Sequence, residues 1–204
     1  MAKTAPQDLK FLPKRAVFLR HGKALPAVDN DDQNRPLSEV GIAQANTRAA
    51  SFKRIEFVGG LSSTAERCYH TGRLAYGFDL DQAPELYLGV NPYDQKSGEM
   101  QFALMLYASL REYITEDRTG WLFRYGRDAV GAIKHVYNTK PSYVRTGGYW
   151  AVAGHAVFCN LMAMLMFPDH ADEIQDICLG EAEALVISPE HGLQYITGDA
   201  IAKV

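Results

Sequence analysis

The sequence has no long apolar run and no apolar leader. Its longest uninterrupted apolar run, residues 161–167, falls far short of the ~20 residues that a bilayer span requires. Residues 1–15 also lack the apolar core of a signal peptide. We therefore expect a soluble, cytoplasmic protein that has no membrane partner.

Cysteine is scarce. The three cysteines, Cys68, Cys159 and Cys178, are odd in number and widely spaced, and no two of them form a C-x-x-C pair. This pattern indicates neither a disulfide framework nor a zinc knuckle. We expect buried thiols in a reducing compartment.

The sequence also has no excess of positive charge. Lys and Arg number 21 against 24 Asp and Glu, so the formal net charge is −3. This balance argues against a nucleic-acid partner, because proteins that bind nucleic acid usually present a broad basic surface. Any anion site is therefore local.

Strand and helix signals alternate along the chain. Short apolar runs predict strands at residues 16–19, 57–61, 84–88, 149–153, 184–187 and 193–197. Helical periodicity and capping signals predict helices at residues 38–53, 63–76, 98–113, 121–138 and 157–167. Ser38 is the expected N-cap of the first helix, and Ser63 to Glu66 form an S-x-x-E capping box for the second.

This alternation predicts an α/β fold, a three-layer α/β/α sandwich with a mostly parallel sheet and helices on both faces. We treat residues 1–204 as one domain with a helical insertion at about 91–145. Residues 23–36, including the acidic run 29–32, are expected to form a solvated loop. Tyr87 and the insertion's tyrosines either line a cleft or pack in the core.

Three polar clusters each follow a predicted strand. They are Arg20-His21-Gly22, the segment 62–67 that ends at Arg67, and Gly154-His155. In an open α/β sheet, ligands bind at the carboxyl ends of the strands, where helix N-termini also point their free N–H groups. Two arginines and two histidines meeting there favour a phosphate ligand, because a guanidinium matches two phosphate oxygens at once.

These residues also suit phosphoryl transfer. A neutral His21 can attack phosphorus once its other ring nitrogen is fixed by a hydrogen bond. Arg20, Arg67 and His155 would hold the equatorial oxygens in the transition state. Gly22 would let the backbone approach the phosphate closely.

Four segments in order resemble the histidine phosphatase superfamily, also called phosphoglycerate mutase-like. They are Val17-Phe18-Leu19-Arg20-His21-Gly22-Lys23-Ala24, Asn34-Arg35-Pro36-Leu37-Ser38-Glu39-Val40-Gly41, Leu61-Ser62-Ser63-Thr64-Ala65-Glu66-Arg67-Cys68-Tyr69-His70-Thr71, and Val152-Ala153-Gly154-His155. The resemblance implies that His21 is phosphorylated during turnover. It also implies that Arg20, Arg67 and His155 complete the phosphate pocket without a metal or other cofactor.

The chain departs from the family's pattern at two places. The segment 23–26, Lys-Ala-Leu-Pro, replaces the Glu-Ser or Glu-Thr that mutases carry after R-H-G, which resembles the small phosphatases instead. The family's proton donor commonly lies in an L-x-E segment, whose matching position here is Leu88. Glu85, Glu99 or no residue at all remain the alternatives for the donor.

The sequence thus predicts a metal-independent phosphatase that hydrolyses a phosphate monoester or a phosphoramidate. Its expected partner is a small phosphorylated metabolite or a phosphohistidine protein. The alternatives are a phosphomutase of the same fold and a non-catalytic module that binds a phosphorylated ligand.

Overall fold

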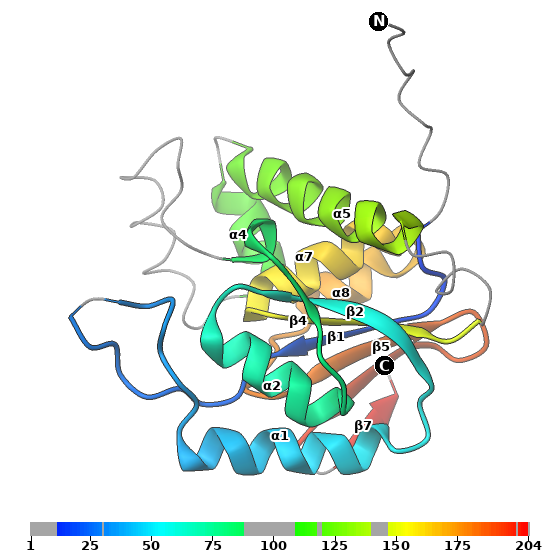
Figure 1. The fold of residues 1–204 in the computed structure, drawn as a ribbon. Helices are drawn as coiled ribbons and strands as arrows, with labels where there is room; N and C mark the ends of the chain where they lie inside the picture. The colour runs from blue at the N-terminus through cyan, green and yellow to red at the C-terminus, as the bar shows by residue number, and fades with distance from the viewer. Residues whose placement is uncertain are drawn as a thin grey trace, which may run out of the picture.

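A computed structural model describes residues 12–29, 31–87, 109–117, 120–139, 147–198 and the backbone of 200–203. Its centre is one seven-stranded sheet with the order β3-β2-β4-β1-β5-β6-β7 (Figure 1). The strands are β1 (Ala16–Arg20), β2 (Phe57–Ser63), β3 (Asp81–Ala83), β4 (Tyr149–Gly154), β5 (Ala184–Ser188), β6 (Gly192–Thr197) and β7 (Ala200–Lys203).

The first four neighbours in this sheet, β3, β2, β4 and β1, pair in parallel. The pairs β1–β5, β5–β6 and β6–β7 are antiparallel, so β6 also points in the direction of β1 and only β5 and β7 oppose it. This arrangement confirms the prediction of a mostly parallel sheet. It also places the carboxyl ends of β2, β4 and β1 next to one another.

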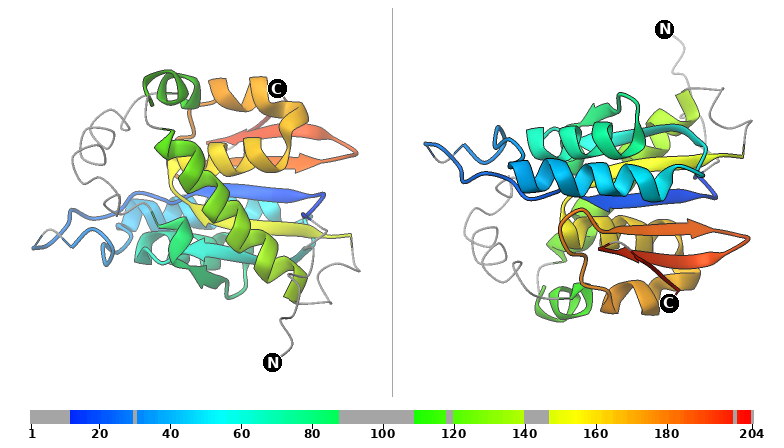
Figure 2. Two further views of the ribbon diagram at one scale, coloured as in Figure 1. Left: turned by 90° about the horizontal axis from the view of Figure 1, so that it is seen from above. Right: turned by 90° about the horizontal axis from the view of Figure 1, so that it is seen from below.

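Helices cover both faces of the sheet (Figure 2). They are α1 (Glu39–Phe52) and α2 (Glu66–Tyr76) on one face, and α4 (Leu110–Glu116), α5 (Trp121–Thr139), α7 (Ala156–Met166) and α8 (Ala171–Asp176) on the other, with the 3₁₀ turns η1 (Pro84–Leu86) and η2 (Pro168–His170). The prediction of a three-layer sandwich is therefore confirmed.

The side chains of strand β1 pack into the hydrophobic clusters on both faces of the sheet. Its side chains alternate between the faces: Phe18 packs in the cluster formed with α5 and α7, whereas Val17 and Leu19 pack with Phe52 of α1 and Tyr76 of α2. All three β1 side chains are fully buried. A strand buried on both faces requires the continuous apolar run that the sequence shows.

The helix starts only partly follow the sequence prediction. Ser38 caps α1 as expected, and its hydroxyl oxygen accepts a hydrogen bond from the Gly41 N–H at 3.1 Å. The predicted capping box at α2 is wrong: the N-cap is Ala65, with no side-chain cap, and the Ser63 hydroxyl belongs to the end of β2. There the Ser63 oxygen accepts from the Ala65 N–H at 3.2 Å.

Two further expectations meet a different structure. The predicted strand at 84–88 is instead the 3₁₀ turn η1, because Pro84 starts a turn directly after the short strand β3. The predicted helix at 98–113 lies mostly outside the described residues, and α4 begins at Leu110 behind a capping box from Ser109. The described part of the insertion contains the two helices α4 and α5.

Strand β7 has no counterpart among the predicted elements. Within the described residues, no helix combines the length and the apolar character needed to cross a bilayer.

Candidate active site

The three predicted polar clusters meet at the carboxyl ends of β1, β2 and β4. Arg20 pairs in register with Gly154 across β1 and β4, which brings the residues that follow each strand together. The rings of His21 and His155 lie 5.4 Å apart between centroids, edge to face at 78°. Arg67, in the first turn of α2, donates from Nε to Nε2 of His21 at 3.3 Å.

The hydrogen bonds of His21 fix its tautomer. Its Nδ1 lies 2.8 Å from the carbonyl oxygen of Gly22, which can only accept, so the neutral ring carries its proton on Nδ1. Nε2 is then the nitrogen without a proton, and its lone pair accepts the hydrogen bond from Arg67 Nε. A buried imidazole with one nitrogen fixed and the other unprotonated is the arrangement that a nucleophilic histidine requires.

The electrostatic environment keeps His21 neutral. Burial lowers the pKa of His21 and the hydrogen bond to Gly22 raises it, while the charges of Arg67, Arg20 and Arg35 lower it further, to about 3. At neutral pH the His21 ring is therefore neutral, with a proton on Nδ1 and none on Nε2.

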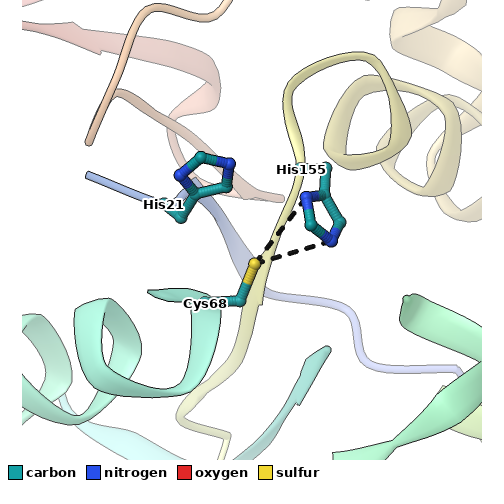
Figure 3. A group of neighbouring side chains, drawn as sticks. All are labelled: His21, Cys68 and His155. Atoms are coloured by element: carbon teal, nitrogen blue, oxygen red, sulfur yellow. Dashed lines mark hydrogen bonds between the residues drawn. The ribbon is translucent and has the colours of Figure 1, made fainter. Parts of the chain in front are cut away.

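His155 forms the opposite wall and is only 5% exposed. It occupies the N-cap position of α7 with an extended backbone. Its Nε2 lies 3.2 Å from the hydroxyl of Ser63 and 3.6 Å from the thiol of Cys68 (Figure 3). Burial and the charges around it, those of His21, Arg67 and Arg20, lower the pKa of His155 well below its usual range.

Arg20 completes the set that the sequence predicts. One of its terminal nitrogens donates to the carbonyl of Leu179 at 2.6 Å. Its buried Nε has no hydrogen-bond partner among the residues that the structure describes. Buried polar groups are rarely left without a partner, and a bound anion would supply one here.

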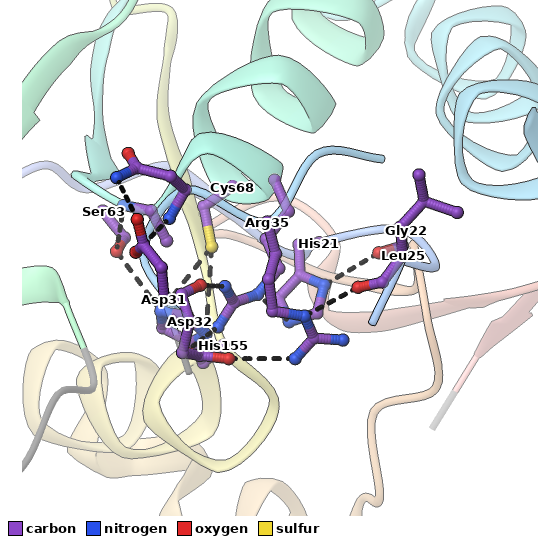
Figure 4. Close-up of polar contacts among 12 residues, drawn as sticks. His21, Gly22, Leu25, Asp31, Asp32, Arg35, Ser63, Cys68 and His155 are labelled. Atoms are coloured by element: carbon purple, nitrogen blue, oxygen red, sulfur yellow. Dashed lines mark hydrogen bonds and ion pairs between the residues drawn. The ribbon is translucent and has the colours of Figure 1, made fainter. Parts of the chain in front are cut away.

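The sequence analysis misses Asp32, which it places in a solvated loop. The Asp32 carboxylate receives a hydrogen bond from Arg67 at 2.8 Å on one oxygen and from Arg35 at 2.9 Å on the other (Figure 4). Arg67 also donates to the backbone carbonyl of Asp32. The loop between the first two motifs thus folds back over the site, and Asp32 neutralises two of its arginines.

Tyr87 is a second residue of this site. Its ring centroid lies 6.1 Å from that of His155, and its hydroxyl hydrogen-bonds to Asp32. Burial and the neighbouring charge of Asp32 raise the pKa of Tyr87. Tyr87 therefore lies beside His155 and Asp32, and whether it lines a cleft stays a prediction.

In the part of the chain that the structure describes, neither candidate proton donor, Glu85 or Glu99, is seen in contact with the predicted pocket. Glu85 is exposed and lines a surface pocket of about 380 Å³ between η1 and α5, together with Gly131 and His135. Glu99 and Leu88 lie outside the described residues. Among the described residues, Asp32 is an acidic group that contacts the predicted pocket, through Arg67.

Gly22 is a glycine for a reason that the sequence does not reveal. A Cβ on Gly22 would lie 2.7 Å from the carbonyl oxygen of Gly41 at the start of α1. The Gly22 N–H donates to the hydroxyl of Thr71 on α2 at 3.0 Å. Gly22 thus lets the loop after β1 pack directly on both helices, and its contact with a phosphate stays a prediction.

One group of metal-ligating side chains occurs in the described part of the chain. Single ligand atoms of His21, Cys68 and His155 lie within 4.8 Å of one another (Figure 3). However, burial raises the pKa of the Cys68 thiol to about 12, so it is protonated at neutral pH and is a poor ligand in that form. The charges of Arg67 and Arg20 also oppose a cation, and the site favours an anion.

Comparisons with known proteins agree with this geometry. Residues 16–86 match the family model of the histidine phosphatase superfamily (branch 1). No curated protein matches the chain.

Solved structures share the fold at low sequence identity. A mycobacterial glucosyl-3-phosphoglycerate phosphatase, Rv2419c, solved with inorganic phosphate, has a TM-score of 0.61 at 16% identity, over 94% of this chain and 99% of that one. The putative phosphohistidine phosphatase SixA from Agrobacterium tumefaciens has a TM-score of 0.53 at 21% identity, over 92% and 99%. A putative alpha-ribazole-5'-P phosphatase from Escherichia coli has a TM-score of 0.59 at 18% identity, over 94% and 99%.

The resemblance predicted from the motifs is therefore confirmed: residues 16–86 carry the sequence pattern of the histidine phosphatase superfamily (branch 1), and the chain shares its fold with the solved structures named above.

Proposed function

We propose that this chain is a metal-independent phosphatase that hydrolyses a phosphate monoester or a phosphoramidate through a phosphohistidine on His21. The observation that carries the proposal is the state of the His21 ring. Nδ1 donates to the Gly22 carbonyl at 2.8 Å, and Nε2, which carries no proton, accepts a hydrogen bond from Arg67 Nε at 3.3 Å. A histidine that only bound phosphate would gain from being protonated, whereas this one is kept neutral.

In the first step, Nε2 of His21 attacks phosphorus opposite the leaving atom. Arg20, Arg67 and His155 surround the equatorial oxygens and stabilise the charge that they carry in the transition state. The unpartnered Nε of Arg20 is one donor for this purpose. The proton on Nδ1 stays with the Gly22 carbonyl, which stabilises the ring as it gains positive charge.

In the second step, water attacks the phosphohistidine, and the electrons of the N–P bond return to Nε2. The same charged groups stabilise this transition state, since it has the same arrangement of equatorial oxygens. Inorganic phosphate then leaves, and His21 is neutral again.

The substrate class follows from the resemblance and from the solved relatives. Two relatives are named as phosphatases of small phosphate esters, and one as a phosphohistidine phosphatase. We therefore propose a small phosphorylated metabolite or a phosphohistidine protein as the substrate. A phosphohistidine substrate would pass its phosphoryl group from one imidazole to another, a transfer between chemically similar atoms.

A trapping experiment tests the proposal. Wild type, His21→Ala and the control His70→Ala are incubated with 4-nitrophenyl phosphate labelled in the phosphoryl group, quenched in alkali, and mapped for label. His70 is a suitable control because it lies on the outer side of α2, where its side chain is 43% exposed and faces Glu66. We expect label on His21 and phosphate release in wild type and His70→Ala, and neither in His21→Ala.

Other outcomes assign the alternatives. Turnover that is equal in wild type and His21→Ala removes the nucleophile. Phosphate binding without turnover in any protein assigns a binding module, and an isomerised phosphate ester in place of inorganic phosphate assigns a mutase.

A further inference from the structure

The carboxylate of Asp32 is bonded to the same guanidinium that faces the nucleophile. Arg67 donates from Nε to Nε2 of His21 at 3.3 Å and from a terminal nitrogen to Asp32 at 2.8 Å. A phosphate bound by Arg67 must therefore displace Asp32 from this nitrogen or share the guanidinium with it. Where they share the guanidinium, the substrate and the carboxylate come into contact.

We propose that Asp32 is the residue that protonates the leaving group, and that substrate binding itself delivers the proton to it. This inference rests on the proposed phosphatase function and assigns the donor that the sequence leaves open. Asp32 would then act as a catalytic residue, because its carboxyl group touches the substrate.

The position of Asp32 suits a donor to the leaving atom. The side chain of Asp32 is 29% exposed, whereas that of Arg67 below it is 4% exposed. Asp32 comes from the loop that folds over the site, and its carboxylate thus lies between the guanidinium and solvent (Figure 4).

The charge balance explains how a carboxylate next to two arginines becomes an acid. In the free protein, burial raises the pKa of Asp32, but the hydrogen bonds and charges of Arg35 and Arg67 outweigh burial and lower it. A bound phosphate takes up the charge of Arg67 and adds negative charge beside the carboxylate. Both changes favour the protonated carboxyl group.

The proton is supplied by the substrate. A phosphate ester that arrives as the monoanion carries one acidic proton, which moves to Asp32 and leaves a dianion on the arginines. As Nε2 of His21 forms its bond to phosphorus, the bond from phosphorus to the leaving oxygen or nitrogen breaks, and that atom takes the proton from Asp32.

In the second half of the reaction, Asp32 accepts a proton from water and passes it to the product phosphate. The Asp32 carboxylate takes a proton from water as the water oxygen bonds to phosphorus and the N–P bond breaks. The product phosphate then takes this proton and leaves as the monoanion, so charge and protons balance over the cycle.

Tyr87 is placed to hold the carboxyl group when Arg67 is taken by phosphate. Its hydroxyl bonds to Asp32 while its ring lies beside His155, 6.1 Å between centroids. Arg35 retains the second oxygen of Asp32 at 2.9 Å. Tyr87 and Arg35 are positioning residues in this scheme.

The test compares two leaving groups in Asp32→Asn and in a matched control. Asparagine keeps the size and one acceptor oxygen but has no carboxyl proton to give. Asp31→Asn is the control, because Asp31 is the neighbouring loop carboxylate, is exposed, and bonds to Asn34 instead of the arginines. The substrates are glycerol phosphate, whose leaving group needs a proton, and 2,4-dinitrophenyl phosphate, whose leaving group does not.

We expect Asp32→Asn to slow the first-turnover release of glycerol from glycerol phosphate by roughly 10²-fold or more, the usual contribution of a positioned acid, and the first-turnover release of dinitrophenol by less than about 10-fold. Calorimetry should show that Asp32→Asn binds inorganic phosphate at least as tightly as wild type, because the competing carboxylate is gone. Asp31→Asn should match wild type in all three measurements.

Three results would overturn the assignment. Equal losses of the first-turnover rate with both esters mean that Asp32 only positions Arg67, and an unchanged first-turnover rate with glycerol phosphate means that it gives no proton. If wild type forms labelled His21 in either case, the phosphatase proposal stands and only Asp32 fails. If wild type turns over neither ester, both proposals fail together.

Discussion

Replacing Gly41 by alanine tests whether α1 and the loop after β1 are held by direct backbone contact. A Cβ on Gly41 would lie 2.1 Å from the carbonyl oxygen of Lys23 and 2.9 Å from its nitrogen. Both atoms belong to backbone, which cannot rotate away as a side chain can. The Lys23 oxygen also accepts hydrogen bonds from the Ser38 N–H at 2.9 Å and the Ser38 hydroxyl at 3.0 Å.

Two opposing effects set the size of the change. Alanine is better than glycine inside a helix by about 1 kcal/mol. Forcing an extra carbon into a packed site costs about 1–3 kcal/mol, and a contact with backbone belongs at the upper end. We therefore expect Gly41→Ala to lower the free energy of unfolding by about 2 kcal/mol.

Gly131→Ala is the matched control. Gly131 also lies within a helix, α5, but a Cβ there would meet no atom within 4 Å. Only the helix preference remains, so this variant should gain about 1 kcal/mol. Urea unfolding of both variants, followed by circular dichroism, measures the difference of about 3 kcal/mol between them.

The phosphatase assay gives an independent readout. Because Gly41 packs against the loop that carries His21, Gly41→Ala should also lower kcat/KM, whereas Gly131→Ala should leave it unchanged. The reasoning is refuted if both variants are stabilised equally, since the contact with Lys23 would then carry no cost.

Three further predictions concern stability and pH. The pKa of His21 is 6.5 in the unfolded chain and about 3 in the folded protein, so folding favours the neutral ring. The contribution of His21 to the free energy of unfolding is therefore complete above pH 6.5 and is lost as the pH falls toward 3. Between pH 6.5 and 4.5, His21→Gln should therefore lose about 2–3 kcal/mol less unfolding free energy than wild type in urea titrations, and parallel losses would contradict this. Asn160→Leu should cost about 2–4 kcal/mol in the same assay at pH 7, because it removes the donor to the carbonyls of Ile174 at 3.0 Å and Ile177 at 2.8 Å from a side chain that is 1% exposed. Gly77→Ala should cost about 1–2 kcal/mol without altering kcat, since its φ of +79° is strained for alanine although a Cβ there meets no atom within 4 Å; an unchanged midpoint would show that the turn relaxes freely.

The predicted part of the site rests on local signals. Arg20 and His21 directly follow a run of fully buried residues, and Gly154-His155 directly follows another. A strand buried on both faces has to end at a sheet edge, and parallel neighbours end at the same edge. The meeting of these motifs was therefore accessible from the sequence alone.

Asp32 was not accessible in this way. Asp32 lies in an acidic loop whose composition is the same whether it faces solvent or folds over the site. Its partners, Arg67 and Arg35, are chosen by the path of the loop, and no periodicity reports that path. Its one sequence signal is its place between two motifs that share a site.

Ser63 shows how a local pattern can mislead. The S-x-x-E spacing fits a capping box, but β2 continues through Ser63, so its hydroxyl lies at the strand end beside His155 instead of at the N-cap. The competing demand of the sheet decides the outcome, and the sequence carries no sign of it.

The pairing of Arg67 with Asp32 has a consequence for the anions of the cell. An unoccupied arginine pocket would bind chloride, acetate and other singly charged ions. Here the Asp32 carboxylate already occupies hydrogen-bond donors of Arg67, and its effective concentration is high because it belongs to the same chain. A competing ion has to offer more than this carboxylate does. A tetrahedral dianion can engage Arg20 and His155 in addition to Arg67, whereas a planar carboxylate has too few oxygens to do so. If the pocket binds phosphate as proposed, the loop carboxylate favours anions with enough oxygens to replace it on Arg67 and also reach Arg20 and His155.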